Sequence, residues 1–272
     1  MQELLSHPAV QAGVAPFLVA LVIGELFLRI RLSGLAIIAG FVVTVYLVSD
    51  FSIEPLTASR KIVLLGISSA IVGLLFGSAQ SNWRSWLLPV LAGAAAVWTL
   101  QRILEQQIPS VMLQWGAACA AYVAILVWGM DKLLEKEPFR ASCAATALGI
   151  GTGGAALIGA SALLGQFGLA IGAAAAAHLI IQLISNQPLP SGRMFTLPFA
   201  LIAGLIGCLA VLSATLPWYT LAILAGIPFA TWLLPLPKQS LRIQSLILVF
   251  TGFSFAAGAL YVTWQAAGAV PL

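Results

Sequence analysis

The sequence predicts an all-α protein, a polytopic transmembrane helix bundle of about ten spans in a single membrane domain of residues 1–272. Three observations support this prediction: the composition, a series of long apolar runs, and the placement of the basic residues. Of the 272 residues, 61% are apolar and only 7% are charged, against about 25% charged in an ordinary soluble domain. The mean hydropathy is +1.06. So few charged side chains cannot cover the surface of a water-soluble protein of this size, and the chain is therefore predicted to lie in a lipid bilayer.

Long apolar runs give the number and type of the elements. A helix needs roughly 20 mostly apolar residues to cross the hydrocarbon core. The runs do not alternate with period two, so helices are predicted rather than the strands of a membrane barrel. The predicted spans are Ala9–Leu28, Leu32–Val48, Ile62–Ala79, Trp86–Leu104, Val111–Met130, Ala141–Leu164, Phe167–Ile184, Met194–Leu216, Trp218–Leu234 and Ile243–Trp264. Arg102 near the end of the fourth span, and the short break at Gly165-Gln166 between the sixth and seventh, make nine spans the second choice.

The basic residues are distributed asymmetrically over the predicted loops. With the N-terminus outside, nine of the 12 Lys and Arg residues fall in cytoplasmic loops, namely Arg29, Arg31, Arg84, Lys132, Lys136, Arg140, Arg193, Lys238 and Arg242. The other three, Arg60, Lys61 and Arg102, fall in the outer loops. Because cytoplasmic loops are enriched in Lys and Arg, both termini are predicted to lie outside the cell's inner (plasma) membrane.

A charged segment, DKLLEKEPFR from Asp131 to Arg140, divides the chain into two halves, residues 1–131 and 141–272, each with five predicted spans. It is predicted to be a solvated cytoplasmic linker. Because five is odd, the second half enters the membrane with opposite orientation, as in the five-plus-five inverted repeats of several transporter folds. In size and span count the chain resembles the ten-helix drug/metabolite transporters. It shares no motif with that family, whose termini are cytoplasmic, so the resemblance is one of architecture alone.

The stretch GIGTGG has the glycine spacing of a dinucleotide-binding loop. That loop requires a preceding β-strand and an acidic residue about 20 positions later. Here a predicted membrane helix precedes it, and no Asp or Glu follows Glu137, so no cofactor is expected. Glycines four residues apart allow two helix backbones to approach closely, which predicts a tight contact between the sixth and seventh spans. The alternative is a locally unwound segment that lines a substrate site. The glycines concerned are Gly149, Gly151, Gly153, Gly154, Gly168 and Gly172.

Ionisable groups inside the membrane are costly and are candidates for function. Apart from Arg102 at the end of the fourth span, the candidates within the predicted spans are Glu25 and His178. Glu25 either pairs with Arg29, one helical turn later, or carries a coupling proton or cation. His178, placed near the middle of the seventh span, either makes a hydrogen bond within the core or relays protons, because imidazole titrates near pH 6.5 in the absence of perturbation. Gln182 adds a neutral polar group to the same span.

The residues required for most other functions are missing. The sequence has no HExxH, Walker or Ser/His/Asp pattern, and its three cysteines lie inside predicted spans without a CxxC, so neither a catalytic nor a metal site is expected. No clustered basic face indicates nucleic acid as a partner. The function expected is therefore non-enzymatic secondary transport of an unidentified small molecule. The alternative is a non-catalytic scaffold or assembly subunit that binds a partner membrane protein or a second copy of the chain. A transporter should contain a polar cavity at membrane depth, whereas a scaffold should have a solid core and an exposed stripe of small residues.

Overall fold

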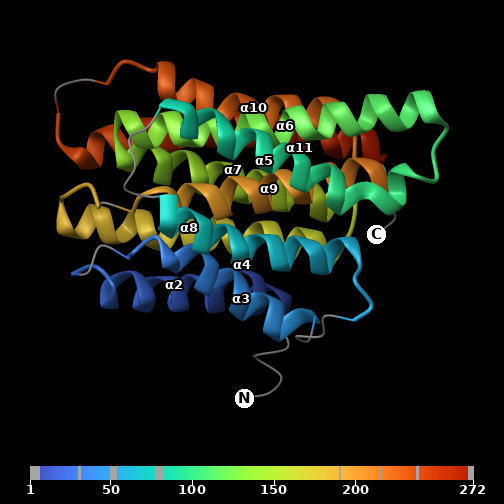
Figure 1. Cartoon of the computed structure of the whole chain (residues 1–272). Coiled ribbons are helices and arrows are strands. Elements are labelled where there is room, and N and C mark those ends of the chain that lie inside the picture. Colours follow the sequence, from blue (N-terminus) through green and yellow to red (C-terminus); the bar gives the residue numbers. More distant parts are fainter. Residues whose placement is uncertain are drawn as a thin grey trace.

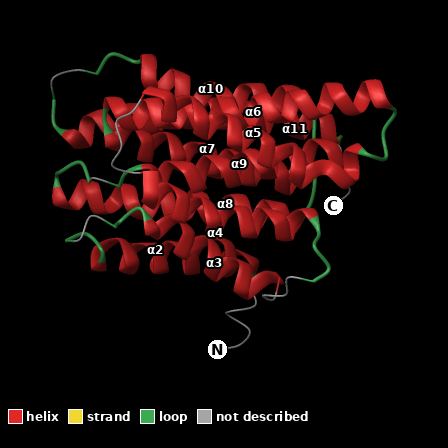
Figure 2. Cartoon of the chain, viewed as in Figure 1, coloured by secondary structure: helices red, strands yellow, loops and turns green. Residues whose placement is uncertain are grey.

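The protein is a bundle of helices that run side by side in alternating directions (Figure 1). This computed structural model describes residues 7–29, 32–49, 54–76, 82–189, 191–214, 216–236 and 239–268. Over these residues the chain forms helices and loops and no strands (Figure 2), which confirms the all-α prediction. Helices satisfy their backbone hydrogen bonds internally, as an apolar surrounding requires.

The helical elements follow the predicted apolar runs. Their bounds are η1 Val10–Val14, α2 Ala15–Leu26, α3 Leu35–Ser49, α4 Ala58–Phe76, α5 Asn82–Leu104, α6 Pro109–Lys136, α7 Pro138–Gly159, α8 Ala162–Ser185, α9 Arg193–Ser213, α10 Trp218–Leu233 and α11 Leu241–Ala267. The π-helical turn η1 continues directly into α2, so the described residues form ten helical rods.

Seven of these helices are long and apolar enough to cross a membrane: α4, α5, α6, α7, α8, α9 and α11. They identify the chain as a multi-pass membrane protein. The continuous rod Val10–Leu26, α3 and α10 are apolar but shorter. Their 17, 15 and 16 residues correspond to about 26, 23 and 24 Å at 1.5 Å per residue, against a core of about 30 Å. Helix length therefore does not confirm the ten-span count.

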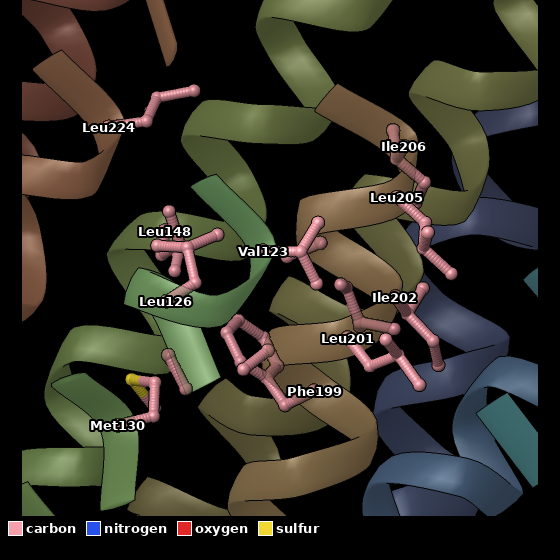
Figure 3. Packing of buried hydrophobic residues seen from close by; sticks show 14 of the residues in the cluster. Val123, Leu126, Met130, Leu148, Phe199, Leu201, Ile202, Leu205, Ile206 and Leu224 are labelled. Atoms are coloured by element: carbon pink, nitrogen blue, oxygen red, sulfur yellow. The ribbon is translucent and has the colours of Figure 1, made fainter. Parts of the chain in front are cut away.

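Helix α9 forms the centre of the bundle, and its residues from Arg193 to Ala210 are all buried. It packs against α4 and α6, and Figure 3 shows Val123 of α6 directed towards α9. Helices α2 and α3 pack on α8, whereas α10 and α11 pack on α7. An inverted repeat would match the α2–α8 contact with an equally extensive contact between α7 and α3, and the described residues form none. The five-plus-five repeat is therefore not confirmed.

The boundary between the sixth and seventh predicted spans is displaced. The break lies at Ala160 and Ser161 rather than at Gly165-Gln166, because Ser161 starts α8 by accepting a hydrogen bond from the backbone N–H of Leu164 at 3.3 Å. A serine in this position caps a helix by replacing a missing intrahelical acceptor. Gly165 consequently lies inside α8, where it contacts Leu157 of α7.

The charged segment between the two halves is helical rather than a solvated linker. Helix α6 continues to Lys136 and α7 begins at Pro138, which leaves Glu137 alone between them. Asp131 and Arg140 are 6% and 3% exposed. The prediction of a solvated segment is wrong for these two residues, because each has polar partners on other helices that allow it to be buried.

Candidate functional site at the linker end

The closest approach of two helices in the core is made by glycines of α7 and α8. A Cβ atom built on Gly149 would lie 2.5 Å from the Cα of Gly172, and one built on Gly168 would lie 2.5 Å from the Cα of Gly153. Any side chain at these positions would push the two backbones apart. Gly151 faces α10 and α11 instead, and Gly154 faces α11. Because α7 is helical from Pro138 to Gly159, it contains no unwound segment at these glycines.

This glycine contact fixes which polar residues meet. The helices are antiparallel, so the pairs Gly153/Gly168 and Gly149/Gly172 set a register that continues to Ser142 of α7 beside His178 of α8. We call the end of the bundle at which α6 ends and α7 begins the linker end; it lies on the left in Figure 1. His178 is seven residues before the end of α8 at Ser185, about 10 Å along the axis. It therefore lies closer to the linker end than its predicted place near the middle of the span.

Ser142, His178 and Gln182 form a buried polar cluster. His178 Nδ1 lies 3.2 Å from Ser142 Oγ and 3.1 Å from Gln182 Nε2, and Gln182 Nε2 donates to Ser142 Oγ at 3.0 Å. All three side chains are fully buried. With Nδ1 as the acceptor in this network, a neutral imidazole carries its proton on Nε2.

Two polar atoms of the cluster have no hydrogen-bond partner among the described residues, His178 Nε2 and Gln182 Oε1. They supply one donor and one acceptor, so the cluster can hydrogen-bond a small polar guest with both functions. The ring of Phe195, whose centroid is 4.6 Å from that of His178, forms an apolar wall beside it. Unpaired polar groups in a core are rare and call for a specific explanation.

A buried ion pair lies close to this cluster. The guanidinium of Arg193 makes two hydrogen bonds to the carboxylate of Asp131. Nε donates to Oδ1 at 2.7 Å, and Nη2 donates to Oδ2 at 2.9 Å. Nη1 also donates to the carbonyl of Phe76, the last residue of α4, at 3.4 Å. The two charged residues are 6% and 8% exposed. A void of about 10 Å³ beside them approaches the space that a single water molecule needs.

The start of α9 connects the ion pair to the polar cluster. Arg193 belongs to the pair, and Phe195, two residues later, contacts His178. Two glycines allow neighbouring helices to reach this turn. A Cβ on Gly73 of α4 would lie 2.7 Å from the carbonyl oxygen of Arg193, and one on Gly34 would lie 2.9 Å from the amide nitrogen of Phe195. A displacement of this turn would change the ion pair and the cluster together.

Other charged residues at the linker end cap helix α10. Arg140 Nη1 donates to the carbonyls of Thr231 and Leu234 at 2.7 and 3.0 Å, and its Nε pairs with Glu137 at 2.7 Å. Lys136 Nζ donates to the carbonyl of Trp232 at 2.6 Å. The last carbonyls of a helix lack intrahelical partners and carry partial negative charge. These cations therefore explain why a charged sequence is found between two apolar helices.

Glu25 is not part of the polar cluster, although Gly24 beside it packs against Ile181, next to Gln182. Glu25 is exposed near the end of α2, and that helix stops at Leu26. Arg29 follows in a turn, so the one-turn spacing expected of a continuous helix is lost, and no ion pair joins these two described residues.

The sequence does not predict the burial of four charged residues: Asp131, Arg140, Arg193 and Lys61. Asp131 and Arg193 border predicted spans directly, next to Met130 and Met194, and this adjacency is the signal that could have identified them. Lys61, expected in an outer loop, is buried in α4, where its Nζ donates to the carbonyl of Trp98 at 2.8 Å and lies 4.5 Å from the centre of the Trp98 ring.

Within the described part of the chain, no three His, Cys, Asp or Glu side chains come together as metal ligands would. The chain matches no protein-family model and no curated protein.

Proposed function

We propose that all ten helical rods cross the inner (plasma) membrane with both ends of the chain outside, and that the protein is a non-enzymatic secondary transporter of a small polar molecule. The observation that carries this proposal is the pair of unpartnered atoms, His178 Nε2 and Gln182 Oε1, buried between apolar helices. Intramembrane polar groups of this kind commonly mark substrate or proton pathways.

The ion pair Asp131–Arg193 suits the role of a gate over this cluster. In our proposal the linker end is closed while the pair is formed, and a shift of the start of α9 separates the two charges and admits water to Ser142 and His178. Buried ion pairs are weak sources of net stability because desolvation offsets much of their attraction. Their exchange between a paired and a hydrated state is therefore compatible with two conformations of similar free energy.

Thiol labelling tests the gate without knowledge of the substrate. The variant Ser142→Cys is made with the three native cysteines replaced by alanine, and is treated in membranes with a membrane-impermeant thiol reagent. We expect slow labelling from the linker end that becomes faster when Asp131→Asn is added. Ser69→Cys, buried on α4 away from the cluster, is the matched control and should stay unlabelled in both backgrounds. Equal rates at Ser142→Cys with and without Asp131→Asn would contradict the gate.

Transport itself is tested in proteoliposomes with an imposed pH gradient and a panel of radiolabelled amino acids, sugars and organic cations. We expect at least one compound to be accumulated, and His178→Ala to reduce its accumulation to the level of empty liposomes. Glu25→Gln, whose side chain is exposed outside the cluster, should retain it. Full gradient-driven uptake by His178→Ala would leave the histidine as a packing residue.

A non-catalytic scaffold is the second candidate, and the dense packing around α9 favours it. In that case the polar cluster is a fixed element of the core. Ser142→Cys would then remain unlabelled with Asp131→Asn present, and no compound of the panel would be accumulated. The same two experiments therefore separate the candidates.

A further inference from the structure

A groove between α6 and α10 opens on the outer surface of the bundle. It has a volume of about 470 Å³, within the range of roughly 300–1,000 Å³ that is typical of small-molecule sites. Its lining is apolar and includes four alanines, Ala118 and Ala121 of α6 and Ala222 and Ala225 of α10, together with Val211 of α9 and several larger side chains. We propose that this groove binds one acyl chain of a membrane lipid, a function independent of the transport proposed above.

The groove exists because α6 and α10 pack closely near the linker end and leave space beyond that contact. Gly129 of α6 meets Pro228 of α10, where a Cβ on the glycine would lie 3.2 Å from the proline Cβ. Beside this contact the rings of Trp128 and Phe229 have centroids 5.9 Å apart. Towards the opposite end of the bundle four of the lining residues are the alanines named above, whose small side chains leave part of the interval unfilled. The groove is thus closed near the linker end and continues along both helices away from it.

Its length matches one leaflet of a bilayer. The lining residues extend from Trp115 to Ile125 on α6 and from Trp218 to Phe229 on α10, which corresponds to about 15–17 Å of helix. Half of the hydrocarbon core is also about 15 Å. The alternative occupant is a membrane-spanning helix of another protein. With a diameter of about 10–12 Å, such a helix would occupy more than about 1,000 Å³ over this length. The dimensions favour a single extended chain.

The mouth of the groove has the side chains expected at a lipid headgroup boundary. Trp115 and Trp218 lie at its open end, and Trp218 is 62% exposed. Tyr219 packs edge-on against Trp218 with ring centroids 5.9 Å apart. Tryptophan and tyrosine concentrate at membrane interfaces, where an apolar ring and a polar N–H or O–H can each meet a suitable surrounding. An acyl chain in the groove would therefore have its headgroup beside these two tryptophans.

Photolabelling of the full chain tests the proposal. The protein is reconstituted in phosphatidylglycerol/phosphatidylethanolamine vesicles that contain a trace of phospholipid with a diazirine on one acyl chain, irradiated, and mapped by peptide mass spectrometry. We expect adducts concentrated in residues 115–125 and 218–229. Labelling spread evenly over all exposed helices would show annular lipid only and would overturn the proposal.

Variants that fill the groove provide the second measurement. Ala121→Leu and Ala222→Leu place larger side chains on exposed positions of the groove walls, and should reduce the adducts in these two segments several-fold. Ala94→Leu of α5 and Ala257→Leu of α11, also exposed, are matched controls and should leave them unchanged. Equal adducts in all four variants would overturn the proposal. So would disulfide cross-linking between two copies through Ala121→Cys, because the groove would then hold a second copy. The mapping of the unsubstituted protein is decisive even if a leucine variant fails to fold.

Discussion

Asp131 and Arg193, 62 positions apart in the sequence, form a bidentate ion pair that joins the end of α6 to the first residue of α9. The pair also engages the final carbonyl of α4 through Arg193. Three helices are therefore held together at the linker end by one guanidinium group. The geometry suits arginine in particular, because its rigid planar fork of donors matches both carboxylate oxygens and leaves a further N–H for a third acceptor.

Removal of one partner should be more harmful than removal of both. We expect Asp131→Asn to lower the free energy of unfolding by about 3–5 kcal/mol, because it leaves the buried charge of Arg193 without its counter-ion. The double variant Asp131→Leu/Arg193→Met should recover much of that loss. Unfolding in mild detergent, followed by circular dichroism, measures both. A double variant less stable than Asp131→Asn would show that the charges themselves hold the linker end together.

The glycine contact should be sensitive to a single methyl group. We expect Gly153→Ala and Gly172→Ala each to destabilise the protein by about 1–3 kcal/mol, because the added Cβ would meet backbone atoms of the opposite helix. Gly258→Ala on α11 is the control, since a Cβ at that position would have nothing within 4 Å, and alanine favours a helix over glycine. Detergent melting temperatures give the comparison. Equal melting temperatures for all three variants would contradict the close approach of α7 and α8.

Arg140 should stabilise α10 from outside that helix. We expect Arg140→Ala to cost about 1.5–3 kcal/mol, the range for hydrogen bonds to a charged group, because the carbonyls of Thr231 and Leu234 lose their donor. Arg242→Ala, on an exposed side chain of α11, should have little effect. Hydrogen exchange of the α10 amides is the direct measurement. Unchanged protection of its last turn in Arg140→Ala would mean that the cap contributes nothing.

The predicted topology can be tested at two exposed positions. Glu135→Cys lies at the linker end and Gln107→Cys in the loop between α5 and α6 at the opposite end. With an impermeant thiol reagent on intact cells, we expect labelling at Gln107→Cys and none at Glu135→Cys until the membrane is opened. The native cysteines Cys119, Cys143 and Cys208 are buried and should give little background. Labelling at Glu135→Cys but not at Gln107→Cys in intact cells would show that the chain has the opposite orientation in the membrane. A cysteine at Ser6, near the N-terminus, would test the same prediction, but Ser6 lies outside the described residues. Gln107 is therefore the better reporter position.

The all-α class of the protein and the course of its helices follow from the composition and the apolar runs. Apolar runs of this length require internally paired backbones in lipid, and this requirement depends on composition alone. The glycine spacing of Gly149/Gly153 and Gly168/Gly172 also pointed to a close helix contact, because each pair lies on one face of its helix. The boundary between those two helices could not be placed in the same way. It depends on the cap at Ser161, a local hydrogen bond that a continuous apolar run conceals.

Which polar residues share a site depends on how the helices pack against one another. The sequence does not distinguish a charged residue at the edge of an apolar run that faces water from one that faces a partner. It therefore predicts loop positions for Asp131 and Arg193. Their burial depends on α6 and α9 lying side by side, a contact between residues 62 positions apart. His178 and Gln182 were singled out from their position in an apolar span. Their partner Ser142 became evident only when the α7–α8 contact fixed the register, because a hydroxyl group in a helix can also bond to its own backbone.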